Sequence, residues 1–102
     1  MIREVEEQRV AIEALCRRFR VHRLALFGSA AAGEFNPQSS DLDFLVEFDA
    51  LQANEYADAY FGLLEALTNL FRRHVDLVVA QSVKNPYLKE SIQQSRALLY
   101  AA

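Results

Sequence analysis

Apolar residues along this chain follow helical spacing in some stretches and strand spacing in others. Between residues 3 and 20 they recur at the three- and four-residue spacing of one helix face. A short apolar run over residues 23–27 ends at Gly28 and predicts a buried strand. Residues 41–48 alternate between apolar and polar and predict a second strand. Its apolar face holds Leu42, Phe44, Val46 and Phe48.

The second half of the chain predicts a long helix over residues 50–72, a third strand over 74–80 and a last helix. Pro86 suits the first turn of that last helix, which we expect to run to about Tyr100. This order predicts an α/β (α+β) fold with a small mixed sheet flanked by helices. The 102 residues fit a single domain over 1–102. The inward side of the long helix is expected to hold Tyr56, Tyr60, Phe61, Leu64, Leu67 and Phe71.

Composition and charge narrow the class of protein. Apolar residues make up 52% of the chain, as expected of a globular domain, and the net charge of -3 disfavours general nucleic-acid binding. No apolar run approaches the ~18 residues of a membrane span, and the first residues are acidic rather than signal-like. We therefore expect a cytoplasmic protein. The single Cys16 lies on the apolar helix face, where a buried hydrophobe is the expected role and a reactive thiol the alternative.

Two aspartates on the second predicted strand are the main candidates for chemistry. Asp41 and Asp43 are spaced by two, so they share one face with Cα atoms ~6.6 Å apart. Such a pair can bind one or two hard cations such as Mg²⁺. Asp76 joins the same face if the third strand lies beside the second, and it then ligates metal or accepts the proton of an attacking hydroxyl. The simpler alternative for Asp41, or for Ser40 before it, is a cap on the local backbone.

Gly28 and Ser29 form a second candidate feature, at the end of the first strand. Glycine lets the backbone approach a ligand closely, and a serine at the start of a helical turn over 29–32 offers a hydroxyl and free N–H groups to an anion. A plain turn with a helix cap is the alternative. The loop that follows is marked by Gly33 and Asn36-Pro37. No P-loop is present, because no Gly-Lys-Ser/Thr follows the turn.

The remaining polar residues have simpler interpretations. Arg17, Arg18 and Arg20 crowd the end of the first helix, where cations suit the helix dipole, although contact with phosphate stays open for them and for Arg23. Glu47 is expected to be solvated. No metal-ligand spacing links His22 to His74, so both are expected to be ordinary histidines. The broad apolar stripe around Tyr56 and Phe61 is expected in the core, with an interface to a partner or a second copy as the alternative.

The run Gly28-Ser29, eleven residues, then Asp41-x-Asp43, with Asp76 on a later strand, resembles the minimal nucleotidyltransferase family. These MntA-like antitoxins belong to the DNA polymerase β superfamily. Val75-Asp76-Leu77-Val78 is similar to the strand that carries the family's third acid, and Asn85-Pro86-Tyr87-Leu88 is more weakly similar to its last helix. The resemblance covers nearly the whole chain.

This resemblance implies a polymerase-β-like fold and transfer of a nucleoside monophosphate, most simply AMP from ATP. It implies that Gly28 and Ser29 hold the phosphates and that Asp41 and Asp43 bind one or two Mg²⁺ ions. Asp76 would complete the metal site or help to activate the acceptor. It also implies a small helical HEPN-type toxin as partner, with one of its tyrosines as acceptor and this chain as antitoxin.

One departure from the family concerns positive charge. Family members usually carry arginine at the position of Ala32 and sometimes at that of Ala30. We therefore expect weaker phosphate binding here, or positive charge supplied by Arg23, Lys84 or a partner chain. A catalytically weak antitoxin that occludes its partner is therefore the main alternative. A transferase that modifies an antibiotic or another small molecule is a third hypothesis, but such enzymes usually need a further acceptor-binding domain.

Overall fold

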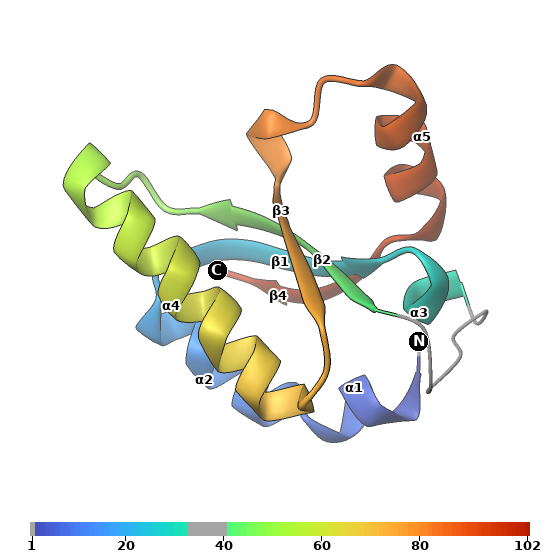
Figure 1. Cartoon of the computed structure of the whole chain (residues 1–102), viewed down its shortest axis with the longest axis horizontal. Coiled ribbons are helices and arrows are strands. Elements are labelled where there is room, and N and C mark those ends of the chain that lie inside the picture. The colour runs from blue at the N-terminus through green and yellow to red at the C-terminus, as the bar shows by residue number, and fades with distance from the viewer. Residues whose placement is uncertain (1, 33–40) are drawn as a thin grey trace.

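The structure, a computed structural model of the chain, describes residues 2–32 and 41–102 (Figure 1). The expected turn at Gly33 and Asn36-Pro37 and the expected cap at Ser40 lie outside these residues. In chain order the elements are α1 (Arg3–Glu7), α2 (Arg9–Arg18), β1 (Val21–Phe27), α3 (Ser29–Ala32), β2 (Leu42–Phe48), α4 (Ala53–Phe71), β3 (Val75–Val79), the 3₁₀ helix η1 (Ala80–Ser82), α5 (Pro86–Ser95) and β4 (Ala97–Ala101).

The four strands form one mixed sheet in the order β3-β2-β1-β4. β1 runs antiparallel to both of its neighbours, whereas β2 and β3 run parallel. Parallel pairing requires a crossover, and the long helix α4 provides it. Figure 1 shows α2 and α4 on one side of the sheet and α5 on the other. The predicted mixed sheet with flanking helices is therefore confirmed.

The core lies between the sheet and the two helices α2 and α4. Alternation along β2 turns Leu42, Phe44 and Val46 toward these helices, and none of the three is exposed. Cys16 on α2 and Leu63 on α4 are likewise fully buried against this face, which confirms the expected burial of the thiol. No helix in the described ranges has the length and apolar character needed to cross a bilayer.

The predicted helix over residues 3–20 is two helices that meet at Gln8. The backbone of Gln8 leaves helical geometry (φ -103°, ψ 13°), while its carbonyl accepts the N–H of Ile12 at 2.9 Å. The predicted apolar face continues across the two helices, because Val5 of α1 and Ile12 of α2 are both fully buried. The second helix ends at Arg18, and Arg20 adopts a left-handed backbone conformation (φ 61°) that turns the chain into β1.

The inward side of α4 differs from the expected one. Leu67 and Phe71 are buried as predicted, and Tyr60 and Leu64 are partly buried against the core. Phe61, by contrast, is 63% exposed and Tyr56 lies at the surface. Leu63 takes the inward place instead. Successive helix residues are rotated by ~100°, so a shift of two positions moves a side chain from the surface to the core. The buried residues of the helix are Ala59, Leu63, Leu67 and Phe71.

The predicted last helix ends five residues before Tyr100. Pro86 occupies its first turn as expected, and the Asn85 side chain accepts the N–H of Tyr87 at 2.9 Å as a cap. Arg96 is extended, and Ala97–Ala101 then pair with the free edge of β1 as a fourth strand. Backbone groups along that edge need partners, and β4 supplies them. The prediction that the last helix continues to about Tyr100 was therefore wrong.

Candidate active site

The parallel register of β2 and β3 brings the predicted acids together. Asp43 lies directly opposite Asp76, and on its other side it faces Phe27, the last residue of β1. Alternation places Asp43 on the same face as Leu45, away from the core under α2 and α4. The strand that carries Asp76 lies beside β2, so Asp76 shares the face of Asp43, as expected from the sequence for this arrangement.

Asp43 is the most perturbed acid of the group. Partial burial, together with repulsion by the Asp76 carboxyl group and a hydrogen bond with it, raises the pKa of Asp43 to about 6. Asp41 acts in the same direction, while His74 opposes the shift. A bound cation would stabilise the ionised form of Asp43, because positive charge offsets both the burial and the repulsion that raise its pKa.

His74 belongs to this cluster, although its spacing in the sequence did not indicate it. Its Nδ1 atom lies 3.3 Å from Oδ2 of Asp41 and 3.8 Å from Oδ1 of Asp76. The three side chains are about half-exposed or more, so they face solvent at the start of the two parallel strands. Spacing in the sequence could not indicate this contact, because the register of β2 and β3 sets it.

Gly28 forms the turn at the end of β1, beside Asp43. Its backbone is left-handed (φ 74°), a conformation that glycine adopts without cost. A Cβ atom built at this position would lie 2.5 Å from Oδ2 of Asp43, closer than any real contact. The absence of a side chain is thus what allows the turn to pack against the acid. Ser29 follows at once and begins α3, so the predicted phosphate-binding pair borders the acidic cluster.

Ser95, at the end of α5, anchors this turn and was not foreseen from the sequence. The Gly28 N–H donates to its Oγ at 3.1 Å, and the same hydroxyl donates to the carbonyl of Ser91 at 3.0 Å. This contact spans 67 residues of sequence, which explains why local patterns gave no sign of it. The last helix therefore fixes the Gly28 turn from the opposite side to Asp43.

Two of the arginines considered as phosphate ligands, Arg20 and Arg23, pair with glutamates in the structure. Arg23 donates to Glu47 at 3.3 Å, and its Cα lies four strand residues, or ~13 Å, from the end of β1. Glu47 is accordingly partly buried and paired rather than fully solvated as expected. Arg20 donates to Glu55 of α4 at 2.9 Å. Ala30 is completely buried, so a long charged side chain at this position would displace the core.

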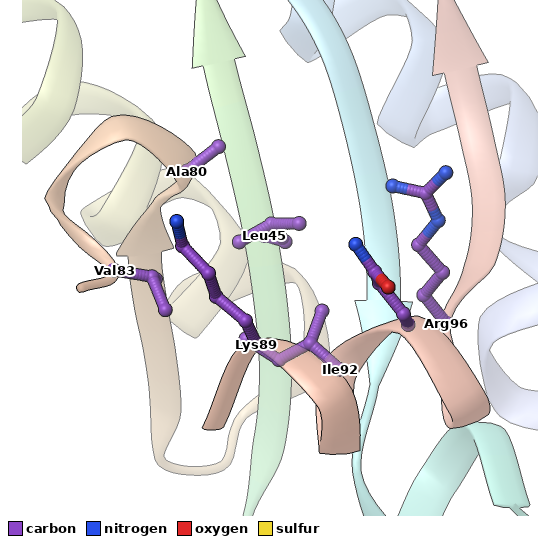
Figure 2. Close-up of a pocket in the computed structure, with 7 residues that line it drawn as sticks. Leu45, Ala80, Val83, Lys89, Ile92 and Arg96 are labelled. Atoms are coloured by element: carbon purple, nitrogen blue, oxygen red, sulfur yellow. The ribbon is translucent and has the colours of Figure 1, made fainter. Parts of the chain in front are cut away.

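A small cavity lies on the same face of the sheet as Asp43, between β2, η1 and α5 (Figure 2). Its volume of about 210 Å³ is below the ~300–1,000 Å³ of typical ligand pockets, so it does not by itself enclose a whole nucleotide. Figure 2 shows the charged side chains of Lys89 and Arg96 beside the apolar side chains of Leu45, Val83 and Ile92. The residues that line it are Leu45, Ala80, Val83, Lys89, Ile92, Gln93 and Arg96.

The donor set suits a divalent metal ion. Carboxylate oxygens are the preferred ligands of Mg²⁺, and Asp41, Asp43 and Asp76 offer them on one open face of the sheet. The donor atoms of Asp41, His74 and Asp76 lie within 4.8 Å of one another. This geometry matches the chemistry expected of an enzyme that handles phosphate groups, with a tight glycine turn beside a cluster of acids.

Comparison with protein families places the chain in a known class. Residues 9–99 match the nucleotidyltransferase domain family, so the chain belongs to that family. Two candidate protein adenylyltransferases of Methanocaldococcus jannaschii are each 39% identical to it. One aligns over 77 residues (76% of this chain, 75% of the relative) and the other over 80 residues (78% of both). The predicted enzyme class, a nucleotidyltransferase, is thereby confirmed.

Solved structures narrow the class to the minimal nucleotidyltransferases. A candidate minimal nucleotidyltransferase is 30% identical, with a TM-score of 0.67 over 91% of this chain and 90% of that one. A chain of an MntA toxin–antitoxin complex is 26% identical (TM-score 0.66; 91% of this chain, 72% of that one). The complex of a tri-AMPylated HEPN toxin with its MNT antitoxin, from Shewanella oneidensis, has the same fold (22% identity, TM-score 0.65; 95% and 72% covered). The resemblance found in the sequence is confirmed.

Proposed function

We propose that this chain transfers AMP from ATP to a hydroxyl group of a partner protein, in a reaction that depends on Mg²⁺. The observation that carries the proposal is the direct pairing of Asp43 with Asp76 beside the Gly28 turn. The similarity to candidate protein adenylyltransferases supports a protein as acceptor and adenylate as the transferred group. The reaction would take place in the cytoplasm, where ATP is available.

In this reaction Asp41, Asp43 and Asp76 would hold one or two Mg²⁺ ions, and Gly28 and Ser29 would hold the phosphates. The bound metal neutralises charge on the phosphate oxygens. The acceptor oxygen forms a bond to the α-phosphorus as the bond to pyrophosphate breaks. The proton of the acceptor hydroxyl passes to a carboxylate, for which Asp76 is the candidate. Ser29 directly follows Gly28 and is the first residue of α3, which supports this role.

The partner we propose is a small helical toxin of the HEPN kind, with a tyrosine as acceptor. The support is the 26% identical chain from an MntA toxin–antitoxin complex, together with the resemblance in the sequence. A partner would also supply the positive charge that Ala30 does not. Modification of the toxin would make this chain its antitoxin.

The test is transfer of label from α-labelled ATP to the purified HEPN-type partner in the presence of Mg²⁺. We expect labelled partner with the wild type and none with the double variant Asp41→Asn/Asp43→Asn. Asp49→Asn is the matched control, because Asp49 is an exposed aspartate that pairs with His22 just after the other end of β2. A wild-type protein that folds and binds its partner but transfers no label would contradict the proposal.

A second candidate function is neutralisation of the partner by occlusion. It is favoured by Ala30, whose buried methyl group stands where family members sometimes carry arginine and offers nothing to a phosphate. Toxin assays separate the two functions. If the Asp41→Asn/Asp43→Asn variant still neutralises the toxin, occlusion is supported. If a folded variant loses neutralisation, transfer is required.

A further inference from the structure

His74 directly precedes β3 and adds an imidazole to the group of aspartates. The pairs Leu42–Val75 and Asp43–Asp76 set the register of the parallel strands, and the N–H of Leu42 donates to the carbonyl of His74 at 3.2 Å. His74 is therefore the neighbour of Asp41. Since alternate residues share a face, the four side chains of Asp41, Asp43, His74 and Asp76 form a two-by-two array on the open side.

The array places an imidazole nitrogen among carboxylate oxygens. Nδ1 of His74 is 3.3 Å from Asp41 and 3.8 Å from Asp76, and all three donor atoms fall within 4.8 Å of one another. Ligand atoms about 2.1 Å from one ion are at most ~4.2 Å apart, so small rotations of these exposed side chains are enough to bring all three to a common ion.

We propose that His74 is a nitrogen ligand of the metal site and shifts its preference from Mg²⁺ toward ions that accept imidazole, such as Mn²⁺ and Zn²⁺. Magnesium is bound by oxygen ligands, whereas imidazole binds the transition metals and zinc. This inference rests on the metal site of the proposed function and on no step of nucleotide transfer. A site of aspartates alone has no nitrogen ligand and would therefore keep the preference for Mg²⁺.

The chain contains two histidines, so His22 provides an internal control. His22 is half-exposed, and its Nδ1 lies 3.5 Å from Oδ1 of Asp49. It therefore has one carboxylate neighbour, whereas His74 has two. A metal that binds exposed histidines without selectivity would affect both residues in the same way.

The experiment is calorimetric titration of chelator-treated protein with Zn²⁺, Mn²⁺ and Mg²⁺, using wild type, His74→Ala and His22→Ala. We expect His74→Ala to weaken Zn²⁺ and Mn²⁺ binding about tenfold or more while Mg²⁺ binding changes little. His22→Ala should match the wild type for every ion. Equal affinities of wild type and His74→Ala for Zn²⁺ and Mn²⁺ would overturn the proposal.

Imidazole NMR of the wild type supplies a readout that does not depend on a variant. Added Zn²⁺ should shift the ring nitrogen signals of His74, and substoichiometric Mn²⁺ should broaden its ring protons before those of His22. Signals of both histidines that respond together, or not at all, would refute direct ligation by His74. The titrations need neither ATP nor the partner. Failure of AMP transfer with intact His74-dependent metal binding would therefore reject the proposed function and leave this inference standing.

Discussion

Asp43 illustrates how the surroundings of one residue set its chemistry. It lies on a central strand, is partly buried and faces Asp76, and these conditions raise its pKa from 3.8 to about 6. In the metal-free protein the folded state therefore binds more protons than the unfolded state between about pH 4 and pH 6. As the pH rises through this window, ionisation of Asp43 lowers the free energy of unfolding. Above the window the whole of this destabilisation is present.

Asp43→Asn should accordingly stabilise the metal-free protein at pH 8 and change little at pH 4. A shift of two pKa units corresponds to at most about 3 kcal/mol, and we expect about 1 kcal/mol because solvent reaches the side chain. Urea unfolding in the presence of a chelator at both pH values measures the difference. A variant that is less stable than wild type at pH 8 would show that the Asp43 carboxylate is stabilising without metal.

Gly28→Ala should impair the site more than the fold. The new methyl group would sit 2.5 Å from Oδ2 of Asp43 in a left-handed backbone, so the carboxylate has to move. We expect the rate of AMP transfer to fall by about tenfold or more, since small misplacements at a reacting centre have large effects. The measurement is single-turnover transfer of label.

Gly62→Ala is the matched control for that experiment. Its methyl group would meet the Phe19 ring at 2.4 Å, in the contact between α2 and α4 and away from the acids. We expect a lower melting temperature and an unchanged rate of transfer. Equal loss of activity in both alanine variants would mean that general destabilisation, rather than displacement of Asp43, explains the effect.

At the scale of elements, α5 is the helix that links the core to the site. Its Ile92 packs with Phe27 and Val83 in a small second cluster on the open side of the sheet. Its last turn presents the Ser95 hydroxyl to the Gly28 N–H. Helix position and turn geometry are thus coupled through one hydrogen bond.

Ser95→Ala should loosen this coupling. The Gly28 N–H would lose its acceptor, a change that typically costs about 1 kcal/mol when the group is partly buried. We expect KM for ATP to rise while kcat changes less, because the turn that we propose to hold phosphate becomes less ordered. Steady-state kinetics at saturating partner provides both values.

Two variants show whether the hydroxyl itself is responsible. Ser95→Thr keeps the hydroxyl and should restore KM. Ser91→Ala leaves intact the backbone carbonyl that accepts from Ser95, so it should behave as wild type. An unchanged KM in Ser95→Ala would show that α5 does not position the turn.

The elements that the sequence predicts correctly are those with a strong local pattern. The alternation over 41–48, the run that ends at Gly28 and the position of Pro86 each correspond to an element in the structure. β4 was missed because Leu98 and Leu99 carry no alternation, and its conformation depends on pairing with β1. The contact of His74 with Asp41 and Asp76 was missed for the same kind of reason, since it exists only through the pairing of two strands that are distant in the sequence.

At the scale of the whole molecule, the two faces of the sheet differ: one holds the core and the other holds the candidate site. One face is closed by α2 and α4 and holds most of the buried apolar residues. The other carries the acids, the Gly28 turn and α5, and it remains partly open. The closed face therefore supports stability, while the open face is available for a ligand and a partner.

The accessibility of the Cys16 thiol measures whether α2 stays packed against the sheet. Cys16 is fully buried, and burial raises the pKa of its thiol to about 12. We expect a thiol reagent to label the native protein only at the rate of unfolding and to label it at once in denaturant. Mass spectrometry against time measures this, with Cys16→Ala as the unlabelled control. Fast labelling under native conditions would mean that α2 detaches from the sheet without global unfolding.

The register of β2 against β3 limits which sequence changes this protein can tolerate. If β3 slipped by one residue, Asp76 would turn into the core and Val75 and Leu77 would turn to solvent. An insertion that shifts this strand would therefore unfold the protein before any loss of catalysis became visible. A stable sheet therefore keeps Asp43 aligned with Asp76, so the register that buries the core also preserves the proposed metal site.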